Sequence, residues 1–313
     1  MVFPHSQIHI SRPLTDFALQ YLQDQKVFIA NEVAPSVNMD KEVDLYYVYG
    51  RTNWKITDAL RAPGSVSNRT RVPALSTDSY CINQYSLHEF VPDREVEEAD
   101  APIAPMQDAT AYIMEQLLVA KEKAVANVLF LTASSANYLS MPAASKWDVT
   151  TTATPIKDVE TARFTIEQEI GRNVNFGIMG RKVYKGLQSA SDILDRIKYT
   201  ERGLITEDII GSVFDLENIV IGRAVYDSVT EEVTSLNVQY IWGNYFLLQH
   251  RNTLAGKKGL THAKQFVKKG DNVAVKQWYK EDNEATKVEA SIYYDFKVIC
   301  TLAGYLITDP VGT

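Results

Sequence analysis

The chain has 313 residues, 45% of them hydrophobic, which is enough to form the core of one large or two modest domains. A formal net charge of −7 argues against a dedicated nucleic-acid binder, because such proteins are normally basic. The two cysteines cannot build a disulfide framework or a cysteine metal cluster, and the sequence has neither a signal-peptide core nor an apolar run of eighteen residues, so we expect a protein of a reducing compartment with no membrane span.

The first 43 residues read as an N-terminal arm with little core of its own. The pattern predicts a short helix from Thr15 to Gln23, with Thr15 as its cap. The stretch 27–39 has extended character and is interrupted by Pro35. Because such an arm frays in an isolated monomer, we expect neighbouring subunits to hold it.

Two segments that alternate with period two, 43–49 and 77–91, flank a stretch rich in turn formers and basic residues. This order predicts a long two-stranded excursion with a loose tip. A single hairpin is only marginally stable in water, so the excursion is expected to lie against another subunit.

A long amphipathic helix follows the proline-marked segment that begins at Asp100, and it is predicted to run about 22 residues to Leu131, roughly 33 Å. We call it the spine. Its predicted apolar face consists of Ile113, Met114, Leu117, Leu118, Ala120, Ala124, Val125 and Val128. Its predicted polar face consists of Gln116, Lys121, Glu122, Lys123 and Asn127.

After the spine, 131–154 reads as a surface connection, and helices then alternate with strands. A helix is predicted over 155–170, buried through Val159, Ala162, Ile166 and Ile170 and ended by Gly171. The pattern further predicts a strand at 174–180, a helix from Arg181 to Ser189, a helix at 207–215 capped by Thr206, and a buried strand at 218–226. This alternation indicates a compact α/β subdomain.

The clearest alternation spans 287–299, a predicted strand of roughly 40 Å. One face carries Val288, Ala290, Ile292, Tyr294, Phe296 and Val298, and the other carries Lys287, Glu289, Ser291, Asp295 and Lys297. Its length matches that of the spine, so we expect the two to pack lengthwise in an elongated, flat domain.

A basic run between His250 and Lys269 holds Arg251, Lys257, Lys258, Lys264, Lys268 and Lys269. It reads either as a solvated loop or as a contact for packaged nucleic acid or an acidic neighbour.

The sequence offers no constellation typical of catalysis. Motifs for dinucleotides, phosphate loops, zinc proteases and serine hydrolases are absent. The histidines His5, His9, His88, His250 and His262 are scattered, and the acidic run Glu89, Asp93, Glu95, Glu97, Glu98 and Asp100 is predicted to be a solvated face. Cys81 and Cys300 are expected to be small buried residues and not nucleophiles. No catalytic, cofactor-binding or metal-binding residue is therefore assigned, and the chain is predicted not to be an enzyme.

Five stretches in this order resemble the major capsid protein of tailed bacteriophages, which has the Hong Kong 97-type fold. They are 85–123 (YSLHEFVPDREVEEADAPIAPMQDATAYIMEQLLVAKEK), 155–187 (PIKDVETARFTIEQEIGRNVNFGIMGRKVYKGL), 204–228 (LITEDIIGSVFDLENIVIGRAVYDS), 240–250 (YIWGNYFLLQH) and 293–311 (YYDFKVICTLAGYLITDPV). The resemblance covers most of 44–311.

The resemblance implies an α+β fold in four parts: an N-terminal arm at 1–43, an extended loop (E-loop) at 44–92, a peripheral (P) domain at 93–130 and 276–299, and an axial (A) domain at 131–275 and 300–313. It also implies self-assembly into hexamers and pentamers of an icosahedral virion head that encloses double-stranded DNA, held by weak non-specific contact. The implied partners are further copies of the chain and a portal. Many relatives carry a fused scaffolding segment before the arm; the short arm here leads us to expect a separate scaffolding protein. One relative cross-links through a lysine of its extended loop, and that chemistry is not assigned to Lys55.

The head would assemble in the host bacterial cytoplasm, and the sequence leaves open whether decoration proteins bind. Two alternatives also stay open. One is an encapsulin-like bacterial nanocompartment shell that holds a cargo enzyme. The other is an ordinary soluble α/β enzyme with an unrecognised site.

Overall fold

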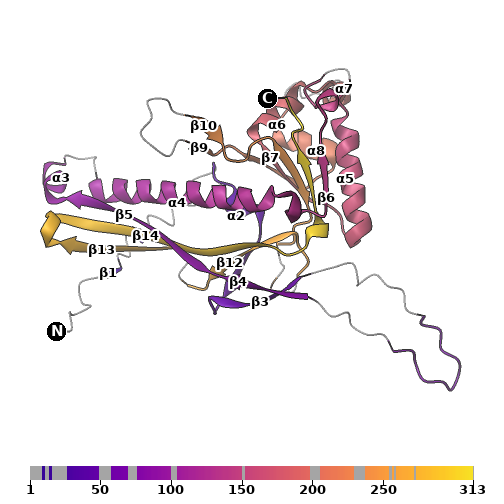
Figure 1. Cartoon of the computed structure of the whole chain (residues 1–313), viewed down its shortest axis with the longest axis horizontal. Helices are drawn as coiled ribbons and strands as arrows, with labels where there is room; N and C mark the ends of the chain where they lie inside the picture. The colour runs from indigo at the N-terminus through magenta and orange to yellow at the C-terminus, as the bar shows by residue number, and fades with distance from the viewer. Residues whose placement is uncertain are drawn as a thin grey trace.

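The computed structural model describes residues 9–10, 14–15, 27–48, 58–69, 76–99, 104–149, 152–197, 205–228, 237–253, 256, 259–270 and 273–312. The described part is elongated, with a long helix and long strands side by side at one end and a helix-covered sheet at the other (Figure 1). Most of the predicted helix Thr15–Gln23, together with His5, Lys55, Lys257 and Lys258, lies outside the described residues.

The larger sheet is built around the long strand β14 (Ala285–Val298). Its order is β1 (His9–Ile10), β13 (Val273–Lys280), β14, β12 (Ala263–Lys268) and β2 (Ser36–Met39), and β5 (Asn83–Pro92) also pairs with β14. Tyr294 pairs with both Val267 of β12 and Asn83 of β5, and Ile292 pairs with both Val273 of β13 and Tyr85 of β5. Because a strand has only two edges, β12 and β13 follow one another along one edge of β14 and β5 lies on the other.

The spine, α4 (Pro105–Leu129), lies along this sheet as predicted (Figure 1). Ile113, Met114 and Leu117 pack against Val288, Ala290, Ile292 and Tyr294, four of the six residues predicted for the inner face of the strand. The lengthwise packing of the two longest elements is therefore confirmed.

The buried face of α4 differs from the prediction in its second half. Ala120 and Ala124 are exposed, whereas Lys121 and Glu122 are buried. The buried residues repeat at spacings of three and four along the whole helix, at 110, 113, 114, 117, 118, 121, 122, 125, 126 and 129. The prediction followed apolar character and not this spacing, so it assigned two charged core positions to solvent.

The smaller sheet has the order β6 (Asn137–Ser140), β15 (Gly304–Thr308), β11 (Tyr245–Gln249), β7 (Phe176–Gly180) and β8 (Asn218–Gly222). One face packs against α5 (Pro155–Ile170), α6 (Arg181–Ser189), α7 (Ser191–Ile197) and α8 (Glu207–Phe214). The other face packs against the end of α4 and the one-turn helix α2 (Ala30–Val33). Strand alternation explains both layers, since Phe246 and Leu248 face α5 while Leu247 faces α4.

Several local predictions in this α/β part are confirmed. Val159, Ala162, Ile166 and Ile170 are buried on α5, and Gly171 ends the helix with φ 62°. Thr206 occupies the N-cap of α8, although its side chain makes no capping hydrogen bond.

Other local predictions are wrong. The stretch 131–154 is more than a surface connection, because it supplies the sheet strand β6 and the fully buried Trp147, with the 3-10 turns Thr132–Ser134 and Ala143–Ser145. The strand 218–226 is split into β8 and β9 (Val225–Asp227), and β9 pairs with β10 (Val238–Tyr240). The extended stretch 27–39 is interrupted by α2.

The predicted excursion begins as a hairpin of β3 (Val43–Val48) and β4 (Ser76–Cys81). The chain then leaves the hairpin after Cys81, and β5 joins β14 in the larger sheet. The predicted strand 77–91 is therefore two strands in two sheets. The short helix α3 (Asp93–Glu98) connects β5 toward α4, and two further 3-10 turns lie at Glu281–Asn283 and Thr301–Ala303.

Candidate assembly surfaces and the spine junction

The described histidines, which the sequence analysis considered as catalytic or metal-binding candidates, do not come together in one site. His88 is exposed beside Phe90, His250 donates from Nδ1 to the Asn173 carbonyl at 2.8 Å, and His262 is fully buried. Burial lowers the pKa of His262 to about 4, so its ring is neutral near pH 7, with Nδ1 3.1 Å from the Cys300 carbonyl oxygen. His9 lies in β1. Within the described ranges, no group of three His, Cys, Asp or Glu residues could hold a metal ion.

The two cysteines lie in different environments. Cys300 is buried as predicted, and burial raises the pKa of its thiol. Cys81 is exposed, so its predicted burial is wrong. Its position at the end of β4 explains the difference: its backbone N–H donates to Asp295 Oδ2 at 2.8 Å while the side chain faces outward.

The basic run is divided between a loop and the centre of the larger sheet. Lys264 and Gln265 are buried on β12, which pairs with β14 and β2. The Lys264 ammonium donates to the carbonyl of Gly256 at 2.8 Å, so the side chain is buried while its charge is hydrogen-bonded. The solvated-loop prediction is therefore wrong for 263–267.

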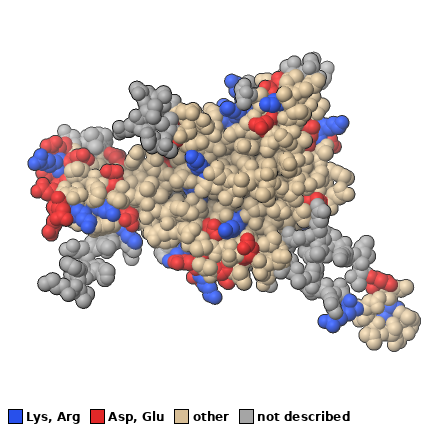
Figure 2. Space-filling view, in the orientation of Figure 1, with Lys and Arg blue, Asp and Glu red and all other residues tan. Residues whose placement is uncertain are grey.

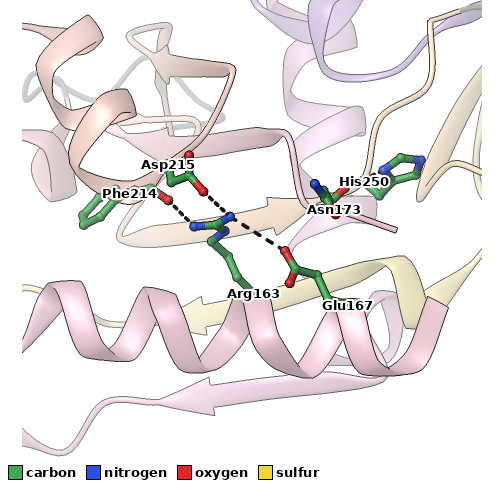
Figure 3. Close-up of polar contacts among 6 residues, drawn as sticks. All are labelled: Arg163, Glu167, Asn173, Phe214, Asp215 and His250. Atoms are coloured by element: carbon green, nitrogen blue, oxygen red, sulfur yellow. Dashed lines mark hydrogen bonds and ion pairs between the residues drawn. The ribbon is translucent and has the colours of Figure 1, made fainter. Parts of the chain in front are cut away.

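Polar contacts also fix the helical layer of the α/β part. Figure 3 shows Arg163 of α5 directed toward the end of α8, where it donates to the Phe214 carbonyl at 3.0 Å and to Asp215 Oδ2 at 2.7 Å. Glu167, one turn further along α5, lies 3.7 Å from the same guanidinium. These contacts satisfy the exposed end of α8 and hold two helices in register.

The junction between α4, α2 and the smaller sheet is formed by a buried carboxylate. Glu122, which is 0% exposed, accepts hydrogen bonds from the Ala30 backbone N–H at 2.6 Å and from Trp242 Nε1 at 2.5 Å. Burial raises the pKa of Glu122 to about 7, although these hydrogen bonds act in the opposite direction. Three segments far apart in sequence therefore meet at one side chain.

Lys121 continues this junction toward the arm. Its ammonium donates to Asn31 Oδ1 at 2.6 Å and lies 4.9 Å from the centre of the Tyr294 ring. The sequence prediction missed Lys121, Glu122 and Trp242, although the three-four spacing of the spine pointed to both charged residues.

Residues 58–69, which we call the tip, lie in the chain between β3 and β4, form their own hydrogen bonds and are well away from the body of the molecule (Figure 1). Arg61 Nε donates to the Ser65 carbonyl at 2.6 Å, and Asn68 Nδ2 donates to the Asp58 carbonyl at 3.0 Å. Leu60 and Val66 are 85% and 90% exposed. The tip thus holds a defined shape that presents two apolar side chains.

The predicted acidic face borders a groove of about 610 Å³ where β5, α3 and the start of α4 meet. Figure 2 shows acidic side chains gathered at this end of the molecule. The groove is lined by Glu89, Phe90, Val91, Glu95, Glu98, Ala99, Pro105, Asp108, Ala109 and Tyr112. The prediction that the acidic residues are exposed is confirmed for Glu89, Glu95, Glu97 and Glu98, whereas Asp93 is half-buried, and the apolar floor between them was not predicted.

No protein-family model matches the sequence. The major capsid protein of Burkholderia phage BcepMu is 26% identical over 313 residues, covering 97% of each chain. A phage-related protein from Bordetella bronchiseptica RB50 is similar in structure with a TM-score of 0.77 and 21% identity, covering 97% of this chain and 99% of that one. The capsid of Cyanophage P-SCSP1u gives a TM-score of 0.57 at 10% identity, covering 98% and 90%.

An encapsulin from Synechococcus elongatus PCC 7942 gives a TM-score of 0.50 at 9% identity, covering 99% and 94%. The phage capsid role is better supported than the encapsulin role. The phage capsid protein is similar in sequence over 97% of the chain, whereas the encapsulin shares the fold at 9% identity. The chain is homologous to the major capsid protein of Burkholderia phage BcepMu and has the Hong Kong 97-type capsid fold.

Proposed function

We propose that the chain is a non-enzymatic structural subunit that assembles into the hexamers and pentamers of an icosahedral phage head around double-stranded DNA. The four parts keep the ranges implied by the family: arm 1–43, E-loop 44–92, P domain 93–130 with 276–299, and A domain 131–275 with 300–313. The head assembles in the host cytoplasm with a portal and a separate scaffolding protein. No helix in the described part of the chain is long and apolar enough to cross a membrane.

The observation that carries the proposal is the match in charge and polarity between the E-loop and the acidic groove. Segment 51–75 has five basic residues and one acidic residue, a net charge of +4. The groove lining has four acidic residues and no basic one, a net charge of −4, beside an apolar floor. The exposed Leu60 and Val66 suit that floor, and opposite charges steer the approach.

The distance of the tip from the rest of its own chain favours a groove on a neighbouring copy (Figure 1). A contact in which the loop of one copy enters the groove of the next is heterologous, and such contacts close into rings when the rotation between copies permits. Rings of this kind are the capsomers of the proposed shell.

Charge reversal tests this contact. Arg61→Glu combined with Arg69→Glu should strongly reduce shell yield, and adding Glu95→Arg with Glu98→Arg should restore it. The reversal Lys185→Glu at an exposed position of α6 is the matched control and should assemble like the wild type. An unchanged yield for the tip variant, or no recovery in the exchanged variant, would refute the contact.

Electron microscopy of the chain, expressed alone and with neighbouring genes, tests the function itself. Closed shells with ring-shaped capsomers are expected, and DNA or a portal in them identifies a virus head. A packaged cargo enzyme would instead support the encapsulin-like alternative. A small oligomer under all conditions would overturn the shell proposal and favour an enzyme.

A further inference from the structure

A partly enclosed cavity of about 220 Å³ lies between α4 and the larger sheet, on the side covered by α2 and β2. It is lined by Asn31, Ser36, Leu118, Lys121, Gln265, Val267, Val273, Ile292, Tyr293 and Tyr294. One water needs only ~10–15 Å³ of such space, so the cavity has room for a small molecule. All of its lining comes from one chain.

Lys121 is the only charged residue in this lining. Its side chain is 7% exposed, and its ammonium donates one hydrogen bond, to Asn31 Oδ1. An ammonium has three N–H donors. Across the described residues, no carboxylate lies within 4.0 Å of this ammonium, since Glu122 turns to Ala30 and Trp242. The cavity therefore holds a buried positive charge with unused donors.

Gln265 supplies a second unused group on the β12 side. It is 3% exposed, and its Oε1 has no hydrogen-bond partner within the described part of the chain. An unpaired buried acceptor costs free energy comparable to a lost hydrogen bond. A guest that brings one donor to this oxygen would recover that cost.

The remaining lining limits the size and polarity of the guest. Leu118, Val267, Val273 and Ile292 form apolar walls, and Tyr294 lies on the same face of the sheet as Ile292 and Val267. A single cation suits a single negative charge, and four aliphatic walls suit a short hydrocarbon chain. The unpaired Gln265 oxygen suits a hydroxyl.

We propose that this cavity binds a short aliphatic hydroxycarboxylate, with its carboxylate on Lys121, its hydroxyl donating to Gln265 Oε1 and its carbon chain against the aliphatic walls. Burial lowers the pKa of Lys121 to about 8, so the ammonium still carries its charge at pH 7. The inference does not rest on the proposed shell, because the whole site lies within one subunit.

Titration of the full-length subunit with 3-hydroxybutyrate, followed by NMR chemical shifts, tests the site at pH 7. Saturable binding is expected for the wild type. Butyrate, which lacks the hydroxyl, should bind about 3–10-fold more weakly, the range expected for one neutral hydrogen bond. 1,3-Butanediol, which lacks the carboxylate, should bind at least about tenfold more weakly, since a charge-assisted contact is stronger.

Two variants assign the contacts. Lys121→Met should abolish binding of both acids, and it should fold because it replaces a buried cation by an apolar chain of similar length. Gln265→Met should remove the preference for 3-hydroxybutyrate over butyrate while keeping butyrate binding. Lys123→Met, at the exposed lysine two positions along α4, is the control and should bind as the wild type does.

Three results would overturn the inference: no saturable binding by the wild type, equal binding by 1,3-butanediol, or equal loss in the Lys121 and Lys123 variants. The measured quantity is ligand binding by the subunit, so a negative result would not bear on the proposal that the subunit forms shells. A subunit that formed no shells could likewise still be tested for ligand binding.

Discussion

At the scale of single residues, the spine carries two adjacent opposite charges into the core without pairing them to each other. Glu122 is satisfied by N–H donors from α2 and from Trp242, whereas Lys121 is turned toward Asn31 and the cavity. A buried charge is tolerated when hydrogen bonds replace its hydration. Both therefore hold the start of α2, Glu122 through Ala30 and Lys121 through Asn31, and Glu122 also joins α2 to Trp242.

Glu122 should make stability depend on pH. Burial raises its pKa from 4.5 to about 7, so the folded chain binds this proton more tightly than the unfolded chain. The resulting stabilisation is fully present below pH 4.5 and is lost as pH rises through 7. Relative to Glu122→Gln, the wild type should lose at most about 3 kcal/mol of unfolding free energy across this window.

Urea unfolding of unassembled subunits between pH 4.5 and 7.5 measures this difference. Glu115→Gln, at an exposed position of the same helix, is the control and should follow the wild-type curve. A constant gap between wild type and Glu122→Gln would show that Glu122 does not titrate in this range. Lys121 does not interfere, because its lowered pKa of about 8 acts at higher pH.

Burial was predicted correctly from the sequence where a residue is apolar and also spaced to lie on the inner face of its helix. Val159, Ala162, Ile166 and Ile170 are apolar, spaced for one helix face and buried. The prediction failed where apolar character and spacing disagree, as at Glu122, whose burial depends on donors at 30 and 242 that lie about 90 and 120 positions away. Local patterns contain no information about such distant partners.

At the scale of elements, the close packing of β7 against the turn before β11 leaves no room for a side chain at Gly180. A Cβ added there would lie 1.9 Å from the Gly243 carbonyl oxygen and 2.8 Å from that of Trp242. Both are backbone atoms, so rotamer changes cannot relieve the overlap. This approach also positions Trp242 beside Glu122.

Gly180→Ala should therefore destabilise the subunit by about 3 kcal/mol or more, the upper end of overpacking costs. Thermal unfolding measures the effect. If the variant yields no soluble subunit at all, the destabilisation is larger still. Gly256→Ala is the matched control, since an added Cβ there meets nothing within 4 Å. Equal melting temperatures for the two variants would contradict the packing described.

Periodicity predicted α4, α5 and β14 because their patterns extend over many residues. It failed for β12, where Ala263–Lys268 reads as part of a basic run although the strand is buried. The long stem of Lys264 hides its charge at Gly256, which the pattern cannot show. The alternation also predicted β4 and β5 as one strand, because the chain passes from one sheet to the other at Ile82 without a break in the period of two.

At the scale of the whole molecule, the isolated chain exposes surfaces that a stable monomer would cover. All of β5 from Asn83 to Phe90 is exposed, including Tyr85, Leu87 and Phe90. The tip at 58–69 adds Leu60 and Val66. Exposed apolar groups beside complementary charges are typical of a subunit designed for contact with further copies.

Salt should separate two electrostatic effects on assembly: the attraction between tip and groove and the general repulsion between acidic subunits. The screening length falls from about 10 Å at 0.1 M to about 3 Å at 1 M, which weakens both the attraction of tip and groove and the repulsion between subunits of net charge −7. The ratio of wild-type to Arg61→Glu assembly rates should therefore fall toward one as salt rises. Light scattering gives both rates, and a ratio independent of salt would rule out charge steering by the tip.

The architecture could be predicted from sequence only through its resemblance to a family. Composition and spacing indicated an α/β subdomain, a spine and a parallel long strand, but the pairing of β2 with β12 and the groove between β5 and α4 join distant segments. These contacts form between segments that are distant in the sequence, so a local pattern cannot predict them.

The lengthwise packing of α4 and β14 has a mechanical consequence. The two form a stiff lever arm of about 37 Å, the length of 25 helical residues at 1.5 Å each. The joint formed by Glu122 and Trp242 lies near one end of this arm and the acidic groove lies at the other. From Glu122 to the far end of α4 at Pro105 is about 26 Å, so a rotation of about 5° at the joint would move that end by about 2 Å. Small angular changes where α4 meets the smaller sheet would therefore be amplified into larger displacements of the acidic groove.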